Sequence, residues 1–352
     1  MDSITQGLLG ATIAEAGFRG KLGGRALAWG ALCGVAPDFD MVAALAGEWA
    51  ALVHHRGVSH SWIAHTLVAP LLGWLAYRFI GRGREGASSA EGTWWRWTHL
   101  TWWALVTHPA LDVCTAYGTQ LLAPLSTERF AIDAVAIIDL VYTLPLLVAL
   151  VWAWRGKERT RSRRVAAGAL VFTTAYLAFG FVQSQRALAM AHDSLRAEGF
   201  DAVEVRALPT MGNVFVHRVA ARDGSGSFRI AMTSLSAPRA LAWSRADDED
   251  DPLVSRALRT EELRIFRWFA MGFAQTELEH VDAGFDVVVS DLRYGSVVEP
   301  TRALWGATAR YARDGELLGV ERWQRRKELD LEAELDALWA LLTGARLENA
   351  RP

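Results

Sequence analysis

Hydrophobic positions are concentrated in the first half of the chain, where long apolar stretches alternate with short polar loops. Two stretches, 131–154 and 165–182, are apolar enough to cross a bilayer, since about 20 helical residues span about 30 Å of hydrocarbon. A third such stretch is 61–80. The weaker stretches 26–46 and 99–114 contain acidic and histidine side chains. We expect these side chains to face the interior of a helical bundle, because contact between a charged side chain and lipid is unfavourable.

The second half of the chain has a different pattern, with amphipathic and alternating segments instead of long apolar runs. Short alternating stretches such as 214–219 and 228–232 predict strands, and 328–342 predicts a helix. The fold class is therefore mainly α: a multi-pass membrane helical bundle over 1–183, followed by a smaller soluble α+β domain over 184–352.

Basic residues predict the orientation in the membrane. The loop 155–164 contains six Lys or Arg residues, and the loop 78–96 is also basic. By the positive-inside rule both loops are expected in the cytoplasm, which places the C-terminal domain on the extracytoplasmic side of a bacterial inner membrane. The first residues lack the basic start of a secretory signal, so we expect the N-terminus to be retained.

Composition argues against several classes of function. The formal net charge is -2 and no long basic stripe is present, so nucleic-acid binding is not expected. The two cysteines, Cys33 and Cys114, lack paired spacing and are interpreted as packing residues. There is no GxSxG motif and no P-loop, which removes support for serine-nucleophile and NTP chemistry.

Acidic and histidine side chains gather beside the apolar segments. Asp38 and Asp40 follow an apolar helix, where the simple interpretation is a helix end with a proline turn. Buried carboxylates nevertheless need partners, and a metal cation would supply one. His55 and His60 belong to a group of three histidines within seven residues at a helix entrance, a density that favours metal ligation over a purely structural role.

A third pair, His108 and Asp112, is spaced to share one face of a helix. Asp112 is either a ligand or the carboxylate that orients His108. Asp2 is a weaker candidate ligand, and Asp139, inside an apolar run, needs a partner from another helix. The acidic run 247–251 is interpreted as a solvated loop.

At these residues the sequence resembles the YdjM family of bacterial membrane-bound metal-dependent hydrolases. The resemblance covers about residues 1–180 and rests on four segments in order: DSITQ at 2–6, PDFD at 37–40, HRGVSHS at 55–61 and THPALD at 107–112. Gln6 departs from the family, in which many members carry His. The family is distantly similar to zinc-dependent phospholipases C, so the resemblance implies hydrolysis, with a phosphoester as the leading substrate bond.

The predicted function is a membrane-bound hydrolase that uses a metal-activated water on a lipid headgroup or a small phosphoester. The expected ligands of the divalent metal, zinc or alternatively manganese or iron, are Asp2, Asp38, Asp40, His55, His60, His108 and Asp112. Arg56 and Asp139 are the expected catalytic residues. A metal-ion transporter and a non-enzymatic scaffold with a structural metal remain alternatives.

Overall fold

The structure is a computed structural model that describes residues 1–352 except 82–89, 157, 326–327 and 346–352. The described chain divides into two compact units, Met1–Phe181 and Val182–Pro352.

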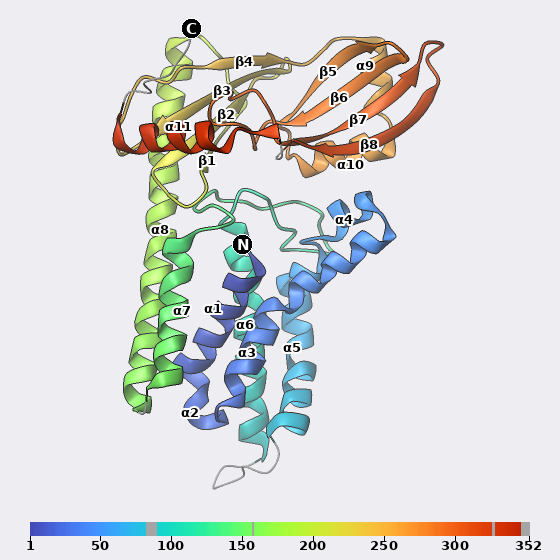
Figure 1. Ribbon diagram of the computed structural model, residues 1–352. Helices are drawn as coiled ribbons and strands as arrows, with labels where there is room; N and C mark the ends of the chain where they lie inside the picture. The colour runs from blue at the N-terminus through green and yellow to red at the C-terminus, as the bar shows by residue number, and fades with distance from the viewer. Residues whose placement is uncertain (82–89, 157, 326–327, 346–352) are drawn as a thin grey trace. The chain divides into compact units, whose positions relative to one another are not determined.

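The first unit is mainly helical, and the long segment 114–139 between two of its helices is irregular (Figure 1). Its elements in chain order are α1 (Ser3–Ile13), η1 (Ala14–Phe18), α2 (Arg19–Leu22), α3 (Arg25–Val35), η2 (Ala36–Ala46), α4 (Glu48–His54), η3 (Val58–His60), α5 (Trp62–Ala76), η4 (Tyr77–Gly81), α6 (Ala90–Val113), α7 (Leu140–Arg155) and α8 (Arg159–Ala197), the last of which continues into the second unit.

Three helical segments of the described chain are long and apolar enough to cross a membrane: Arg25–Ala46, Trp62–Gly81 and Arg159–Ala197. They cover the stretches expected at 26–46, 61–80 and 165–182. α7 is apolar but shorter. The expected helix over 131–154 was wrong in its first part, because the chain is irregular up to Asp139, whose carboxylate accepts hydrogen bonds from Val141 N and Tyr142 N and so begins α7 at Leu140.

Helices α1 and α3 approach closely through glycines. A Cβ atom on Gly10 would lie 2.1 Å from the carbonyl oxygen of Gly30, and a Cβ on Gly34 would lie 2.4 Å from the carbonyl oxygen of Gln6. Small residues permit such backbone contact where membrane helices pack. The contact fixes the start of α1 against the end of α3, which is where acidic and histidine residues gather.

Apolar side chains serve two purposes in this unit. Some form a buried core, in which Trp97 and Leu100 of α6 pack against Ala26 and Ala76, and Cys33 packs among neighbouring alanines as expected from its sequence context. Others, such as Leu67 of α5, are exposed over most of their surface. Outward-facing apolar side chains on an apolar helix are what a bilayer requires.

The second unit contains two four-stranded antiparallel sheets, with strand orders β1-β2-β3-β4 and β5-β6-β7-β8. The strands are β1 (Glu204–Pro209), β2 (Val216–Arg222), β3 (Ser227–Ser234), β4 (Ser244–Asp247), β5 (Ala274–Val281), β6 (Gly284–Asp291), β7 (Trp305–Ala312) and β8 (Leu317–Gln324); the helices are α9 (Pro252–Ala257), α10 (Glu261–Phe269) and α11 (Leu331–Thr343). Helices and two antiparallel sheets are the content expected of an α+β domain.

Candidate metal centre

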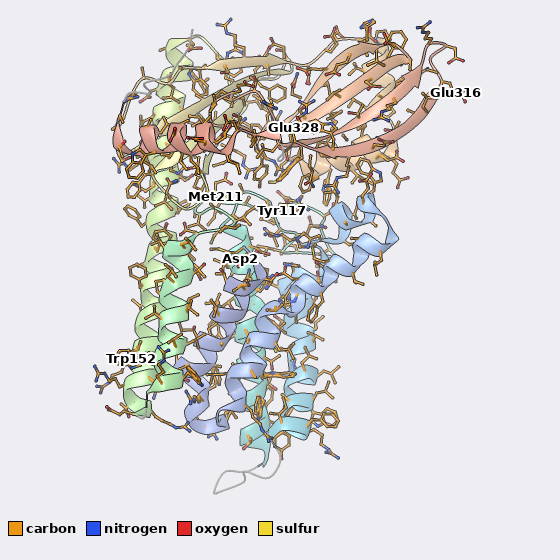
Figure 2. All side chains as sticks on the ribbon, viewed as in Figure 1. Asp2, Tyr117, Trp152, Met211, Glu316 and Glu328 are labelled. Atoms are coloured by element: carbon orange, nitrogen blue, oxygen red, sulfur yellow. The ribbon has the colours of Figure 1, made fainter. Side chains whose placement is uncertain are left out.

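The sequence motifs come together at one end of the helical unit. Asp38 lies in η2 directly after α3, His60 lies in η3 just before α5, and His108 lies in the last turns of α6. Ser61 begins α5 by accepting hydrogen bonds from Ile63 N and Ala64 N, which fixes His60 at the helix entrance. In Figure 2 the label of Asp2 marks this end of the bundle, and the label of Trp152 marks the opposite end.

Three side chains present one ligand atom each to a common point. Asp38 Oδ1 lies 3.5 Å from His60 Nε2 and 3.4 Å from His108 Nε2, and the two Nε2 atoms are 3.0 Å apart. All three ligand atoms lie within 4.8 Å of one another, so these residues could hold a metal ion. Both histidine side chains are fully buried, and Asp38 is 11% exposed.

Hydrogen bonds at the other ring nitrogens fix the tautomers. His108 Nδ1 lies 2.6 Å from the carbonyl oxygen of Gly34, which can only accept, so Nδ1 donates. His60 Nδ1 lies 3.1 Å from Asp40 Oδ2 and donates to it in the same way. In neutral rings both Nε2 atoms then carry lone pairs, and these face each other at 3.0 Å beside a carboxylate. Two facing lone pairs repel each other, and either a proton on His60 or a metal cation at this point removes the repulsion, so the residues fit a metal.

Asp112 completes the acidic surroundings of this point. Its Oδ2 atom lies 3.3 Å from His60 Nε2 and 3.5 Å from His108 Nε2, and among the described residues it has no hydrogen-bond partner. Its Oδ1 atom is engaged elsewhere, by Arg56 Nη2 at 3.2 Å, Gln6 Nε2 at 3.1 Å and the amino group of Met1. One oxygen of Asp112 therefore remains available to a metal.

The carboxylates change the titration of His60. Burial alone lowers its pKa, but the neighbouring carboxylates of Asp112, Asp38 and Asp40 outweigh burial and raise the pKa to about 10. The point where the ligand atoms meet therefore favours positive charge.

Asp40 and His55 lie farther from the common point than the three converging side chains do. Asp40 accepts hydrogen bonds from His55 Nδ1 at 2.8 Å, from the backbone N–H of Arg56 at 3.0 Å and from the hydroxyl of Ser59. With His60 Nδ1 as a further donor, its carboxylate is fully occupied. Sequence analysis predicted Asp40 and His55 to be ligands. In the structure, the carboxylate of Asp40 accepts hydrogen bonds from Nδ1 of His60 and from Nδ1 of His55, which lies at the edge of the site.

Arg56 has a left-handed backbone, with φ of 59°. This conformation costs a non-glycine residue roughly 1–2 kcal/mol. The side chain is buried; Nη1 donates to Thr115 Oγ1 at 3.1 Å, and the guanidinium lies 4.7 Å from the ring centre of Tyr117. Strain maintained by such contacts is common at functional sites.

Two predicted site residues lie apart from the converging group. Asp2 begins α1, and its carboxylate accepts hydrogen bonds from Thr5 N at 2.9 Å and Thr5 Oγ1 at 2.7 Å. Asp139 begins α7 and accepts a hydrogen bond from the hydroxyl of Tyr176 in α8 at 2.8 Å. The structure thus gives Asp139 the interhelical partner that its apolar surroundings require, and this contact joins α7 to α8.

Other contributors were missed by sequence reasoning. The hydroxyl group of Ser59 donates a hydrogen bond to Asp40. The carbonyl group of Gly34, which fixes the tautomer of His108, has no side-chain signal at all. Tyr117 lies beyond the motifs, and its ring faces both Arg56 and His55.

A family of known proteins matches the part of the chain that contains this site. The profile of the family described as YdjM inner membrane protein matches residues 1–187, which include every residue of the candidate metal centre. No match is found among curated proteins or among solved structures. Because the match spans more than half of the chain, the chain belongs to the YdjM inner membrane protein family.

Proposed function

We propose that the protein is a membrane-bound, metal-dependent hydrolase whose substrate is a phosphoester, such as the headgroup of a membrane lipid. The observation that carries the proposal is the convergence of two histidine Nε2 atoms with the carboxylates of Asp38 and Asp112. Mixed nitrogen and oxygen ligands suit zinc, and also manganese or iron.

The ligands of the metal would be Asp38, His60 and His108, with Asp112 Oδ2 as the fourth donor. A divalent metal held there would supply a bound water with its pKa lowered toward about 7. Asp40 would keep His60 in the tautomer that leaves Nε2 free, a role that outer carboxylates commonly have at metal sites.

Two further side chains are placed to assist hydrolysis. Arg56 lies next to Asp112, where its guanidinium would stabilise negative charge on a phosphoryl oxygen. His55 keeps Nδ1 on Asp40 and is 19% exposed at the edge of the site. Its Nε2 atom would accept the proton released as water attacks, and would return that proton to the leaving group.

The membrane arrangement follows from the candidate spans. We propose that the helical segment Ser3–Leu22, then Arg25–Ala46, Trp62–Gly81, α6, α7 and α8 cross the membrane with the basic loop 155–164 in the cytoplasm. The metal centre lies at the other end of the bundle from that loop, so it would open to the extracytoplasmic side. The C-terminal domain, which follows α8, would also be extracytoplasmic.

The test is turnover of a chromogenic phosphodiester by the full chain in detergent, with metal content measured on the same sample. We expect zinc or a similar metal to be bound, and expect a chelator to abolish turnover that added metal restores. His108→Ala should lose both metal and turnover, while Glu316→Gln, in the β7–β8 turn of the other unit, should lose neither.

Three results would contradict the proposal in different ways. Absence of bound metal would remove the metal centre. Bound metal with flux into vesicles but no turnover would instead support a transporter. Bound metal with neither flux nor turnover would indicate a structural metal.

A further inference from the structure

The first sheet of the second unit has an exposed apolar turn between two of its strands. The turn covers residues 210–215 and joins β1 to β2, which pair with Pro209 opposite His217. Met211, which Figure 2 labels, is 68% exposed, and Phe215 is 37% exposed. Single exposed apolar residues are common on soluble proteins, but apolar side chains that gather in one place indicate a contact surface.

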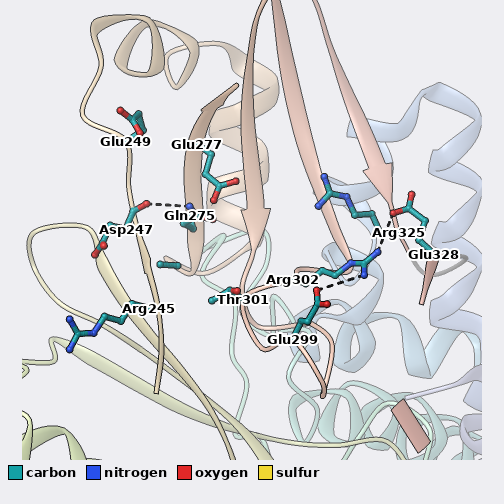
Figure 3. Close-up of a pocket in the computed structure, with 11 residues that line it drawn as sticks. Arg245, Asp247, Glu249, Gln275, Glu277, Glu299, Thr301, Arg302, Arg325 and Glu328 are labelled. Atoms are coloured by element: carbon teal, nitrogen blue, oxygen red, sulfur yellow. Dashed lines mark hydrogen bonds and ion pairs between the residues drawn. The ribbon is translucent and has the colours of Figure 1, made fainter. Parts of the chain in front are cut away.

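Charge is absent from the segment around this turn. No Asp, Glu, Lys or Arg occurs between Arg206 and Arg218. Elsewhere the same unit is rich in charged side chains, and the polar cleft drawn in Figure 3, for example, is lined mainly by carboxylates and guanidinium groups. The turn therefore differs from its surroundings in the property that decides whether a segment can enter lipid, because charge is costly there.

The backbone of the turn is hydrogen-bonded within the turn itself. Thr210 N donates to the carbonyl oxygen of Val216 at 2.9 Å. The side-chain oxygen of Asn213 accepts hydrogen bonds from Phe215 N at 3.0 Å and from Val216 N at 2.8 Å. Asn213 Nδ2 donates in turn to Thr210 Oγ1 at 2.8 Å. These internal bonds lower the cost of moving the turn out of water, since polar groups that leave water need other partners.

The position of the turn along α8 follows from the contacts of β1. The chain reverses after α8, and β1 runs back along the helix, with Ser184 Oγ donating to the carbonyl oxygen of Ala207 at 3.1 Å. Ala187 packs in the same core as Ala207. Because a strand advances about 3.3 Å per residue, Pro209 lies up to about 7 Å beyond the level of Ser184, and the turn lies beyond Pro209. The turn thus extends toward the earlier, apolar residues of α8.

The level of Ser184 on α8 is also where hydropathy places the edge of a bilayer. The run 165–182 contains no charged residue, and polar residues begin at Gln183. Val182 is 52% exposed, and Arg186, one helical turn further, is exposed as well. An exposed apolar side chain followed by an exposed arginine is typical of a helix that passes from acyl chains into lipid headgroups.

From these features we infer that the β1–β2 turn docks on the membrane, with Met211 and Phe215 inserted at the boundary between lipid headgroups and acyl chains. The inference rests on the proposed crossing of the membrane by α8. Lipid fits this surface because the turn continues the apolar surface of α8. Two side chains are also far fewer than the roughly 20–30 residues that each partner contributes to a stable protein interface.

The experiment measures the depth of a fluorescent label on the full chain in nanodiscs of phosphatidylethanolamine and phosphatidylglycerol. The label NBD is attached to Met211→Cys, Ser225→Cys or Val171→Cys in separate samples. Ser225 is an exposed residue of the β2–β3 turn, at the opposite end of the sheet, and Val171 is an exposed residue in the apolar run of α8. The wild-type chain measures background labelling of Cys33 and Cys114.

Two quenchers report the surroundings of each label. Iodide quenches labels in water, and lipids with a nitroxide on the upper acyl chain quench labels in the membrane. We expect nitroxide quenching and loss of iodide quenching at the positions of Met211 and Val171, and the opposite at Ser225. Both turn positions are exposed, so labelling should not affect folding.

The position of Val171 separates failure of this inference from failure of the proposed crossing. If the label at Val171 is quenched by nitroxide lipid while the label at Met211 behaves like that at Ser225, the turn lies in water and the inference is overturned. A label at Met211 shielded from both quenchers would also overturn it, since protein would then cover the turn. Absence of nitroxide quenching at Val171 would contradict the crossing by α8, and the inference with it.

Discussion

Two histidines of the candidate site, His55 and His108, are predicted to lose metal affinity to very different extents when each is replaced by alanine. His60 and His108 each direct Nε2 at the point where Asp38 and Asp112 converge, whereas His55 directs Nδ1 at Asp40 and lies at the edge of the site. His108→Ala removes a proposed ligand. His55→Ala instead removes a hydrogen-bond partner of Asp40, whose carboxylate orients the proposed ligand His60. Metal affinity should therefore separate the two variants.

The size of the difference follows from the geometry. Loss of an outer hydrogen-bonding partner costs about 10–100-fold in metal affinity. We expect Asp40→Asn to fall in that range, because its carboxylate contacts His60 Nδ1 directly. His55→Ala, which acts only through Asp40, should lose less than about tenfold. His108→Ala should lose more than about 100-fold, because a direct ligand is gone.

Thermal unfolding of the full chain in detergent measures this difference through ligand stabilisation. At a free metal concentration about 100 times the wild-type Kd, bound metal stabilises the fold by about 2.7 kcal/mol. A 100-fold weaker site at the same concentration is stabilised by only about 0.4 kcal/mol. His55→Ala should retain most of the metal-dependent rise in Tm and His108→Ala very little.

Elemental analysis of the same samples provides the independent measure. If His55→Ala lost as much metal as His108→Ala, His55 would be a ligand and the assignment of outer roles to His55 and Asp40 would be wrong. Full metal retention in His108→Ala would remove that histidine from the site.

Three further predictions concern the architecture. A reporter inserted in the loop 155–164 should be active only in the cytoplasm and one fused after residue 352 only outside it; the reverse pattern would invert the topology. Gly30→Ala should destabilise the helical unit by about 1–3 kcal/mol in thermal unfolding, because the new Cβ would lie 2.4 Å from the carbonyl oxygen of Gly10, whereas Gly20→Ala, with open space around it, should not. Arg218→Ala should lower the free energy of unfolding of the second unit by roughly 3 kcal/mol or more, since three carbonyl groups lose their donor; a change below about 1 kcal/mol would show that water replaces the guanidinium.

The sequence by itself indicated the family and the residues of the candidate site. Long apolar stretches predict membrane-crossing helices because hydrocarbon requires each backbone group to be satisfied within its own helix, and the described chain contains three helical segments long and apolar enough for this. The family was predicted from four short motifs and is confirmed by the match over residues 1–187. Asp38, His60, His108 and Asp112 were all identified before their positions in space were known.

Only the tertiary structure decided which of these side chains act directly on a common point. Ligand roles depend on which ring nitrogen faces inward, and that is set by distant partners such as the carbonyl group of Gly34 for His108 and the carboxylate of Asp40 for His60. The start of α7 depended likewise on the hydrogen bonds of Asp139, since hydropathy detects apolar surface but not the cap that begins a helix. In the second unit, the loop between β6 and β7 is bound by Arg218 on β2, more than 70 residues away in sequence, a contact between segments that no local pattern encodes.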